Sequence, residues 1–325
     1  MAFIRALVLG YEKYGKDPAE ALRQAQITSA ELRRPEARIT AAQMESVCAH
    51  AMQELDDEAL GWFRRKMRWG SYGMLCRASI TSPDLGVALK RWCRHHGLLV
   101  DDIALSLEID GEVARLVIEE RVELGAMREF CLVTCLRYVH GYACWLIDSQ
   151  VPLTEANFPF RAPPHAAVYP LLFPGPVYFG APRAGFSFDT QYLAMPLRRD
   201  ERALRTMLRR ALPLTVLQYR RDRLLAQRVK DLLRHRAQEF VNAETVAAEL
   251  QVSVRSLHRQ LQGEGSSLQR LKDEARRDLA IEQLRRTARP VKQIALAVGF
   301  TNEKSFARAF RGWTGQAPSD FRKGG

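Results

Sequence analysis

The clearest alternation of apolar and polar positions lies near the end of the chain, between residues 291 and 323. Ile294, Ala295 and Val298 form a small apolar helical face, and Gly299 allows the positive φ that a bend between two helices often needs. A second helix, predicted over residues 302–313, has aromatic residues spaced four and three apart on one face and cations on the other. The aromatic set is Phe306, Phe310 and Trp313, and the cationic set is Lys304, Arg308 and Arg311. This pattern fits the recognition helix of a helix-turn-helix, although an amphipathic surface helix with a solvated basic face would share it.

A similar unit occurs upstream, which weakens the surface-helix interpretation. Residues 243–250 predict a short helix, Gln251 and Val252 a turn, and Ser253 an N-cap whose side chain accepts from free helix N–H groups. The helix that follows has an apolar face of Val254, Leu257 and Leu261. Its other face presents Arg255, Ser256 and Arg259. The chain therefore predicts two helix-turn-helix units.

One long helix is predicted between the two units, over residues 266–286. Ser266 and Gln269 have the spacing of a capping box at its start. At 1.5 Å per residue this helix spans about 30 Å. Major grooves one turn apart on one face of B-DNA are separated by roughly 34 Å. Both recognition helices can therefore dock on one duplex without a dimer.

Residues from about 228 to 323 resemble the DNA-binding domain of the AraC/XylS family of bacterial transcription regulators. The resemblance rests on a run of spaced residues in each unit. These are Ala247, Leu250, Ser253, Leu257, Ala280, Leu284, Ile294, Ala295, Val298, Gly299, Phe300, Ser305, Phe306, Arg308, Ala309, Phe310, Gly315, Pro318, Phe321 and Arg322. The front half resembles the α+β effector domain of the family's ornithine-utilisation and quorum-sensing-modulator type regulators, and does not resemble the cupin barrel of the arabinose regulator.

The two recognition helices carry side chains that can read base edges. Arginine can donate to N7 and O6 of guanine, so Arg255 and Arg259 are candidates in the first unit, and Lys304 and Arg308 in the second. Ser256 can contact base or phosphate, His258 lies at the edge of the face, Ala307 can meet a thymine methyl and Glu303 can accept from cytosine. Ser253 and Thr301 mark the two helix starts. The resemblance implies that family members use the same helix positions.

For each arginine a phosphate contact, which positions the protein without specifying sequence, remains the alternative. The first recognition helix is also expected to end early, because residues 262–265 read Gln-Gly-Glu-Gly where many helices would continue.

The front half predicts a mixture of helices and strands. Helices are expected over residues 2–14, after Pro18, over 41–55 with Thr40 as cap, over 56–67, over 85–98 and over 130–147. Residues 69–73 predict a turn. A hairpin over 103–119 turns at Asp110 and Gly111, and short strands are expected over 167–173, 177–180 and 186–189. Eight of the fifteen prolines lie between Pro152 and Pro182, which argues against regular helix there. The predicted fold is an α+β effector domain followed by an all-α DNA-binding domain with two helix-turn-helix motifs joined by a long helix.

Charge separates the two parts of the chain. Residues 201–325 hold 26 Lys+Arg and 13 Asp+Glu, a net of +13, whereas residues 1–200 hold 23 and 24, a net of −1. A basic domain beside a neutral one suggests a polyanionic partner for the basic domain alone. The predicted organisation is an effector-sensing or dimerisation domain over 1–200, a linker helix over 201–222 and a DNA-binding domain over 223–325.

Other functional classes find little support. The six cysteines are scattered over apolar helical stretches without C-x-x-C or zinc spacing, so no metal and no cofactor is predicted. Haem binding through His140 or His95 is an alternative that a visible absorption band would reveal. The common nucleotide-binding, hydrolase and zinc-protease motifs are absent, so no enzyme is predicted. We expect no signal peptide and no membrane span, hence a cytoplasmic, nucleoid-associated protein.

The predicted function is a sequence-specific DNA-binding transcriptional regulator, an activator that responds to a small-molecule effector. Its expected partners are double-stranded promoter DNA, RNA polymerase, an effector and a second copy of the chain in a homodimer. We also expect an apolar-lined pocket or a dimer surface near residues 69–75 and 169–188, which are rich in large apolar residues. The alternative is a ligand-independent DNA-binding protein whose front domain only dimerises.

Overall fold

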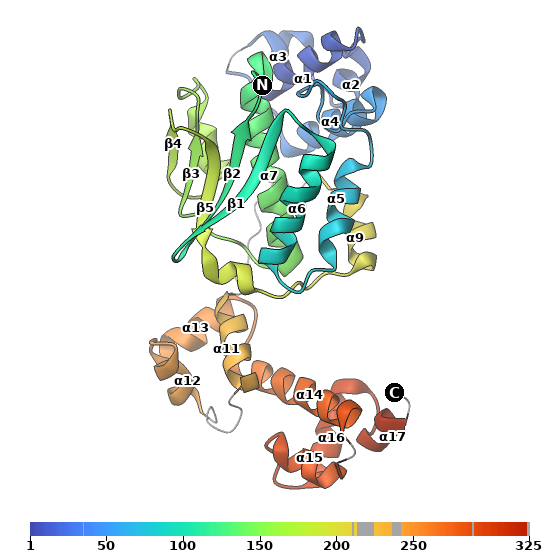
Figure 1. Ribbon diagram of the computed structural model, residues 1–325, viewed down its shortest axis with the longest axis vertical. Coiled ribbons are helices and arrows are strands. Elements are labelled where there is room, and N and C mark those ends of the chain that lie inside the picture. Colours follow the sequence, from blue (N-terminus) through green and yellow to red (C-terminus); the bar gives the residue numbers. More distant parts are fainter. Residues whose placement is uncertain (35, 210, 213–223, 236–241, 288, 324–325) are drawn as a thin grey trace. The chain divides into compact units, whose positions relative to one another are not determined.

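Two units, Met1–Arg220 and Arg221–Gly325, make up the chain in a computed structural model (Figure 1). The structure describes all residues except 35, 210, 213–223, 236–241, 288 and 324–325. The first unit contains helices and a sheet, and the second contains helices in its described part. The observed fold is therefore the predicted α+β domain followed by an all-α domain.

The N-terminal unit begins with four helices and continues with two more before the sheet. They are α1 (Ala2–Lys13), α2 (Ala19–Gln24), α3 (Ser29–Arg33), α4 (Ala41–Leu55), α5 (Ser71–Ile80) and α6 (Leu85–Leu99). Thr40 forms a capping box with Gln43 at the start of α4, and Asp84 caps α6 by accepting from the Val87 N–H. The predicted helices 2–14, 41–55 and 85–98 are therefore confirmed to within a residue at their ends.

The sheet has five strands in the order β1-β2-β5-β3-β4. The strands are β1 (Ile103–Asp110), β2 (Val113–Glu120), β3 (Glu155–Phe158), β4 (Val177–Phe179) and β5 (Ala184–Asp189). β1 and β2 form the predicted hairpin, with Asp110 opposite Val113 and Gly111 at φ 57°. β5 pairs antiparallel with both β2 and β3, while β3 and β4 run parallel. The result is an open sheet and not a closed barrel.

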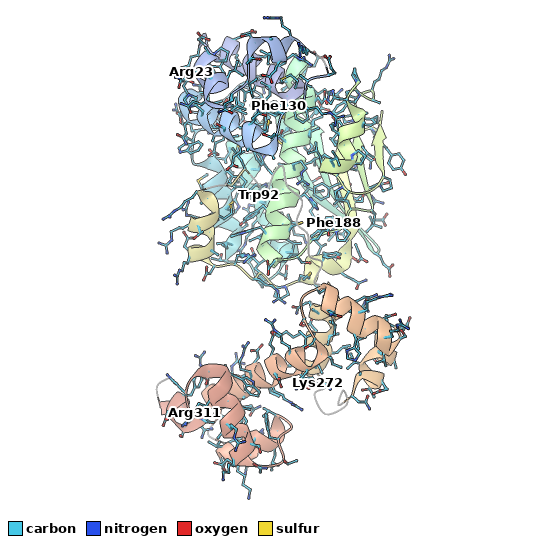
Figure 2. The ribbon with its side chains drawn as sticks, turned by 180° about the vertical axis from the view of Figure 1, so that it is seen from behind. Arg23, Trp92, Phe130, Phe188, Lys272 and Arg311 are labelled. Carbon is cyan, nitrogen blue, oxygen red and sulfur yellow. The ribbon has the colours of Figure 1, made fainter. Side chains whose placement is uncertain are left out.

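The centre of the N-terminal unit is α7 (Arg128–Ile147), which follows the short 3-10 helix η1 (Gly125–Met127). Most of its residues are buried, including Arg137 at 2% exposure. The segment Gly125–Ile147 is long and apolar enough to cross a membrane, but its apolar stretch is almost entirely buried inside the protein. It is the core helix of this unit, and Phe130 within it lies in the interior together with Trp92 and Phe188 (Figure 2).

The predicted helix over residues 56–67 is wrong. Asp56 ends α4 in the left-handed region at φ 51°, and the following segment is a loop built around Asp57. The Asp57 carboxylate, 1% exposed as a residue, accepts from the backbone N–H groups of Ala59, Gly61 and Met67. A buried carboxylate that satisfies three loop amides gives this segment an alternative to helix.

Three further expectations for the front half need correction. Residues 71–73 open helix α5 instead of forming a turn, because Gly70 at φ 98° makes the bend just before them. Residues 167–173 form the end of η2 (Ala166–Val168) and the short helix α8 (Tyr169–Leu172) instead of a strand, so a helical turn does occur in the proline-rich stretch. Strand β3 was not predicted. The strands near 177–180 and 186–189 are confirmed as β4 and β5.

The last described elements of the N-terminal unit are η3 (Thr190–Ala194) and α9 (Glu201–Leu208). α9 packs against α5, and Arg77 on α5 forms an ion pair with Glu201. The predicted linker helix over 201–222 thus contains α9, but its positions 210 and 213–222 lie outside the described residues.

The C-terminal unit contains seven described helices. They are α11 (Leu224–His235), α12 (Ala243–Glu249), α13 (Val254–Gly263), α14 (Leu268–Arg286), α15 (Val291–Ala297), α16 (Glu303–Thr314) and α17 (Pro318–Lys323). α14 is the predicted long connecting helix, but Ser267 and not Ser266 is its N-cap, accepting from the Arg270 N–H at 3.2 Å. Gln269 bonds to Asp273 within the helix, so the predicted capping box is absent.

Two separate apolar cores stabilise the C-terminal unit. The first contains residues of α11, α12, α13 and the start of α14, among them Leu257, Leu261 and Leu271. The second contains residues of the end of α14, of α15 and of α16, among them Phe306 and Phe310, with Phe321 of α17 packed against it. α14 contributes to both cores and so joins two helical modules.

Candidate nucleic-acid interface

The first module has the local geometry of a helix-turn-helix. Gln251 adopts φ 55°, and the Val252 N–H donates to Ala247 O at 2.9 Å, so the chain turns sharply after α12. Ser253 then caps α13 by accepting from the Ser256 N–H at 3.1 Å, as predicted. α13 continues to Gly263, and the positive φ of 70° at Gly265 follows its end.

Most of the residues predicted to read bases from α13 are exposed. Leu257 and Leu261 are fully buried, and this fixes the opposite face of the helix toward solvent. Arg255, His258 and Arg259 are exposed on that face. Ser256 is half-buried, and its hydroxyl lies 2.9 Å from that of Ser253. The two serines therefore share the N-cap, whereas the arginines and the histidine project freely from the helix.

The second module repeats the arrangement with aromatic anchors. Gly299 lies at φ 85°, and the Phe300 N–H donates to Ala295 O at 2.9 Å, which makes the turn after α15. Phe306 and Phe310 are fully buried, with ring centroids 5.6 Å apart, and Phe300 contacts Phe306 edge-on. Paired aromatic rings add roughly 0.5–1.5 kcal/mol beyond their buried area. The aromatic face of α16 therefore holds the helix in a fixed orientation.

The outward face of α16 presents Glu303, Lys304 and Arg308 to solvent, with Ala307 half-buried between them. Asn302 is the N-cap and accepts from the Ser305 N–H at 2.8 Å. The predicted helix start at Thr301 is therefore one residue early, although Thr301 is exposed and adjacent. Arg311 also projects outward (Figure 2).

Helix α14 sets the distance between the two modules. Its 19 residues span about 28 Å at 1.5 Å per residue. Lys230 on α11 contacts Glu274 at 3.4 Å and Asp278 at 3.1 Å, which ties the first module to the middle of α14. Burial alone would raise the pKa of Asp278, but hydrogen bonds from Arg277 and Lys230 outweigh it and the pKa is lowered. The carboxylate is thus held in its charged form beside Lys230.

Two residues of the modules were not recognised from the sequence. The guanidinium of Arg276 lies 5.5 Å from the Phe300 ring centroid and covers the turn at Gly299. Glu264 accepts from the backbone N–H groups of Leu225 and Ala226 at 3.2 and 2.7 Å, so it caps the start of α11 from just beyond α13. Neither contact follows a local spacing rule. Glu264 is about forty residues from Leu225 and Ala226 in the chain, and Arg276 is about twenty-four residues from Phe300.

Of the two histidines considered as haem ligands, His140 uses both of its ring nitrogens in contacts inside the protein. His140 donates from Nε2 to Val151 O at 2.8 Å and accepts at Nδ1 from Arg137 at 3.0 Å. His95 donates from Nδ1 to Arg91 O at 2.6 Å. Within the described residues no group of three or more His, Cys, Asp or Glu side chains is placed to hold a metal ion.

Both parts of the chain match known families. Residues 15–197 match the arabinose-binding N-terminal domain of AraC transcription regulators, which is more than half of the chain, and residues 246–324 match a helix-turn-helix domain. The chain belongs to the AraC family of transcription regulators. The ornithine utilization regulator of Pseudomonas aeruginosa is 28% identical over 99% of this chain and 96% of its own length.

Two further similarities cover about a third of the chain and nearly all of it. The regulator VqsM of Pseudomonas aeruginosa is 34% identical over 30% of this chain and 30% of its own length. The crystal structure of the transcriptional regulator CdpR from Pseudomonas aeruginosa aligns over 99% of this chain and 98% of that chain, with 21% identity and a TM-score of 0.38. As an AraC-type protein, the chain is a DNA-binding transcriptional regulator, and its relatives are regulators and not enzymes.

Proposed function

We propose that the chain binds one promoter site through both modules, with α13 and α16 in successive major grooves. The observation that carries this proposal is the pair of exposed cationic helix faces on two modules joined by α14. Its length of about 28 Å is close to the roughly 34 Å groove repeat. Arg255 and Arg259 would read one half of the site, and Lys304 and Arg308 the other, with Ser253, Ser256, His258, Thr301, Glu303 and Ala307 as further contacts.

The proposal for the N-terminal unit is that residues 1–200 bind a small-molecule effector and that the regulator is an activator in contact with RNA polymerase. The likeness to an ornithine utilization regulator over 99% of the chain supports a metabolite as effector. Residues 201–222 would link this unit to the DNA-binding residues 223–325. The alternative is a ligand-independent regulator whose front unit only forms a homodimer. We place the protein in the cytoplasm, on the nucleoid when it is bound.

Selection of bound sequences from a random DNA library tests the docking. A wild-type monomer site should consist of two unlike boxes about ten base pairs apart, because the two exposed faces differ. Arg259→Ala should weaken binding by roughly 1–3 kcal/mol and relax preference in one box, and Arg308→Ala should do so in the other. Arg161→Ala, on an exposed loop of the N-terminal unit, is the matched control and should change neither box.

Uniform weakening of all sequences by both variants would restrict these arginines to phosphate contacts. If each variant altered both boxes, docking in two grooves would be wrong. Activation and effector response are tested separately by transcription from the selected site with and without candidate metabolites.

A further inference from the structure

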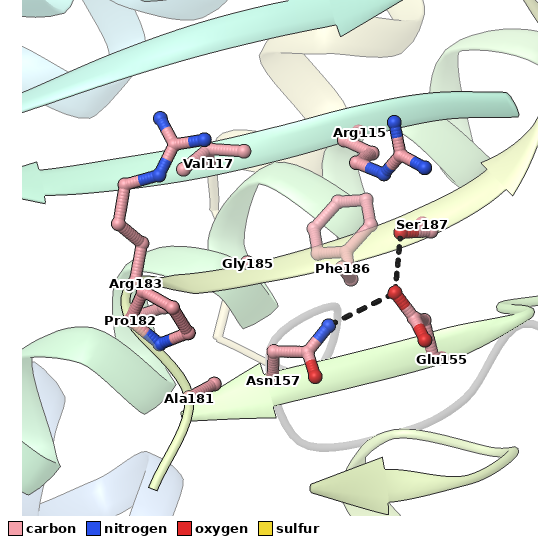
Figure 3. Close-up of a pocket in the computed structure, with 11 residues that line it drawn as sticks. Arg115, Val117, Glu155, Asn157, Ala181, Pro182, Arg183, Gly185, Phe186 and Ser187 are labelled. Carbon is pink, nitrogen blue, oxygen red and sulfur yellow. Dashed lines mark hydrogen bonds between the residues drawn. The ribbon is translucent and has the colours of Figure 1, made fainter. Parts of the chain in front are cut away.

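A cavity of about 280 Å³ opens on the face of the sheet that points away from α7 (Figure 3). β2, β3 and β5 line it, together with residues 181–183 just before β5. Part of this lining belongs to the stretch 169–188 where a pocket was expected, and none belongs to 69–75. The lining combines apolar side chains, among them Val117, Pro182 and Phe186, with the charged and polar side chains of Arg115, Glu155, Asn157, Arg183 and Ser187. The cavity volume lies just below the roughly 300–1,000 Å³ of drug-sized ligand sites, which suits a small metabolite.

Strand register explains why charged groups meet on this face. Side chains alternate between the two faces of a sheet. Leu116 and Phe186 are paired and buried, and the Phe186 ring contacts His140 of α7 at 5.4 Å, which identifies the inner face. Arg115 and Glu155 are both paired with Ser187 and therefore lie in one row on the outer face.

The neighbouring row leaves the space that forms the cavity. Val117 pairs with Gly185, and Asn157 pairs with the same glycine from the other side. Gly185 has no side chain, so the outer face has a depression between Val117 and Asn157. The polar side chains of the adjacent row lie beside this depression. A Cβ at this position would also lie 2.6 Å from Leu116 O, so the close approach of β5 to β2 requires glycine.

Glu155 presents an unpaired negative charge to the cavity. Its Oε1 accepts from Asn157 Nδ2 at 3.0 Å and from Ser187 Oγ at 3.2 Å, and both donors are neutral (Figure 3). In the described part of the chain no cation lies within ion-pair distance of this half-buried carboxylate, and its Oε2 has no hydrogen-bond partner. A carboxylate fixed by neutral donors, with one oxygen free, is an acceptor for a cationic group.

Arg115 presents a complementary positive charge from the same row. Among the described residues its side chain has one polar partner, an oxygen of Asp110, at 3.4 Å. The Asp110 side chain is 81% exposed, and such surface pairs contribute little to stability. A ligand carboxylate could therefore replace Asp110 on the guanidinium at small cost. Arg183, at the rim, is held by two hydrogen bonds to Glu108.

We propose that this cavity binds a small zwitterion, whose ammonium group contacts Glu155 and whose carboxylate contacts Arg115. The assignment deepens the proposed function, on which it rests, by giving the effector a chemical class. A dianion would face the Glu155 carboxylate and a dication would face Arg115, whereas a neutral sugar would leave both charges without a charged partner. A zwitterion satisfies both charges at once, and Ser187 between them offers a further hydroxyl.

The probes are the twenty standard L-amino acids, added one at a time to the full-length chain. Binding is measured by calorimetry and by the rise in unfolding temperature that a ligand specific for the native state produces. At least one amino acid should bind. Its N-acetyl form, which lacks the ammonium charge, and its methyl ester, which lacks the carboxylate, should each bind about tenfold more weakly or worse.

Matched variants locate the site. Glu155→Gln keeps an oxygen that can accept from Asn157 and Ser187, so the sheet should remain folded while the charge is lost. It should weaken binding of the free amino acid by about tenfold or more. Arg115→Gln should do the same. Glu123→Gln and Arg161→Gln change the same charges at exposed positions outside the cavity and should bind like the wild type.

Two results would overturn the assignment: no amino acid binds, or the best one binds Glu155→Gln and Arg115→Gln as tightly as the wild type. Sequence-selective DNA binding, measured on the same preparations, separates the two levels of the proposal. If the chain selects DNA but binds no amino acid at this site, the proposed regulator stands and the zwitterion site falls. If an amino acid binds here but no DNA sequence is selected, the site stands and the proposed promoter binding falls.

Discussion

At the scale of single residues, Ser253 and Asn302 occupy corresponding positions at the starts of the two exposed helices. Each accepts from the backbone N–H three residues ahead, at 3.1 Å for Ser253 and 2.8 Å for Asn302. Thr301 has the side chain of an N-cap but lies one position too early to make this bond. A helix has one N-cap, the residue directly before its first helical residue, so only one of these two adjacent residues can cap α16.

Asn302→Ala should therefore destabilise the second module by about 1 kcal/mol, because a free helix N–H loses its acceptor. Thr301→Ala should change the free energy of unfolding by only a few tenths of that, since its side chain caps no amide. Urea unfolding of the two variants beside the wild type measures the difference. Equal losses for both variants would mean that the two residues share the cap.

Buried histidines give the N-terminal unit a dependence on pH. Burial, and then the neighbouring Arg137, lower the pKa of His140 from 6.5 to about 3. Burial lowers the pKa of His96 to about 4. Both rings therefore stay neutral in the folded protein at a pH where the unfolded chain takes up protons. Their contribution to stability is complete above about pH 6.5 and is lost as the pH falls toward the folded pKa values.

His140→Gln should reduce this dependence, because it removes one of the two titrating rings. We expect the wild-type free energy of unfolding to fall more steeply than that of the variant between about pH 7 and about pH 4.5. Urea titrations at intervals across this range give both slopes. Parallel slopes would show that protonation of His140 is not linked to unfolding.

At the scale of elements, the helices and strands whose ends depend on contacts between nearby residues were predicted correctly. Thr40 with Gln43, Asp84, and the turn at Asp110 and Gly111 each act within a few residues, and the elements they start or end were found at the expected places. The loop around Asp57 could not be found in this way. Its carboxylate binds amides as far away as Met67 and the hydroxyl of Tyr14, so only the folded chain brings the partners together.

The two exposed cationic helices α13 and α16 were predictable for the same reason, and the row of charged side chains at the sheet cavity was not. The spacing of apolar residues along each helix is enough to place Leu257 and Phe306 on the buried face and Arg259 and Arg308 on the exposed face. Glu155 lies in the same row as Arg115 only because β5 is paired between β2 and β3. No spacing of residues along the chain predicts that strand order. Pairing between distant strands depends on the whole fold and leaves a weak local pattern.

The two cores of the C-terminal unit predict that its modules respond separately to damage. Phe306 is fully buried in the second core, so Phe306→Ala should cost about 3–5 kcal/mol there. Amide hydrogen exchange should rise across α15, α16 and α17, while amides of α12 and α13 keep their protection. Lys304→Ala, on the exposed face of the same helix, is the control and should leave exchange unchanged. Equal loss of protection in both modules would show that they unfold as one.

At the scale of the whole molecule, excess positive charge is confined to the back part of the chain, with +13 in residues 201–325 against −1 in residues 1–200. We predict that a fragment of residues 222–325 folds and binds promoter DNA alone, because it contains both cores. Its affinity should fall steeply with salt as counterions are released from the DNA. Fluorescence anisotropy over a series of salt concentrations measures the slope. A folded fragment whose affinity is independent of salt would contradict the prediction.

Helix α14 imposes a double restriction on how this protein can change. Each residue inserted between Ala275 of the first core and Ala280 of the second would turn one module by about 100° relative to the other. Seven inserted residues would nearly restore the angle but lengthen the helix by about 10 Å, almost a third of a groove repeat. No small insertion preserves both rotation and reach. Substitutions along α14 can therefore accumulate, while its residue count should be the same in every homologue that recognises two boxes with this spacing.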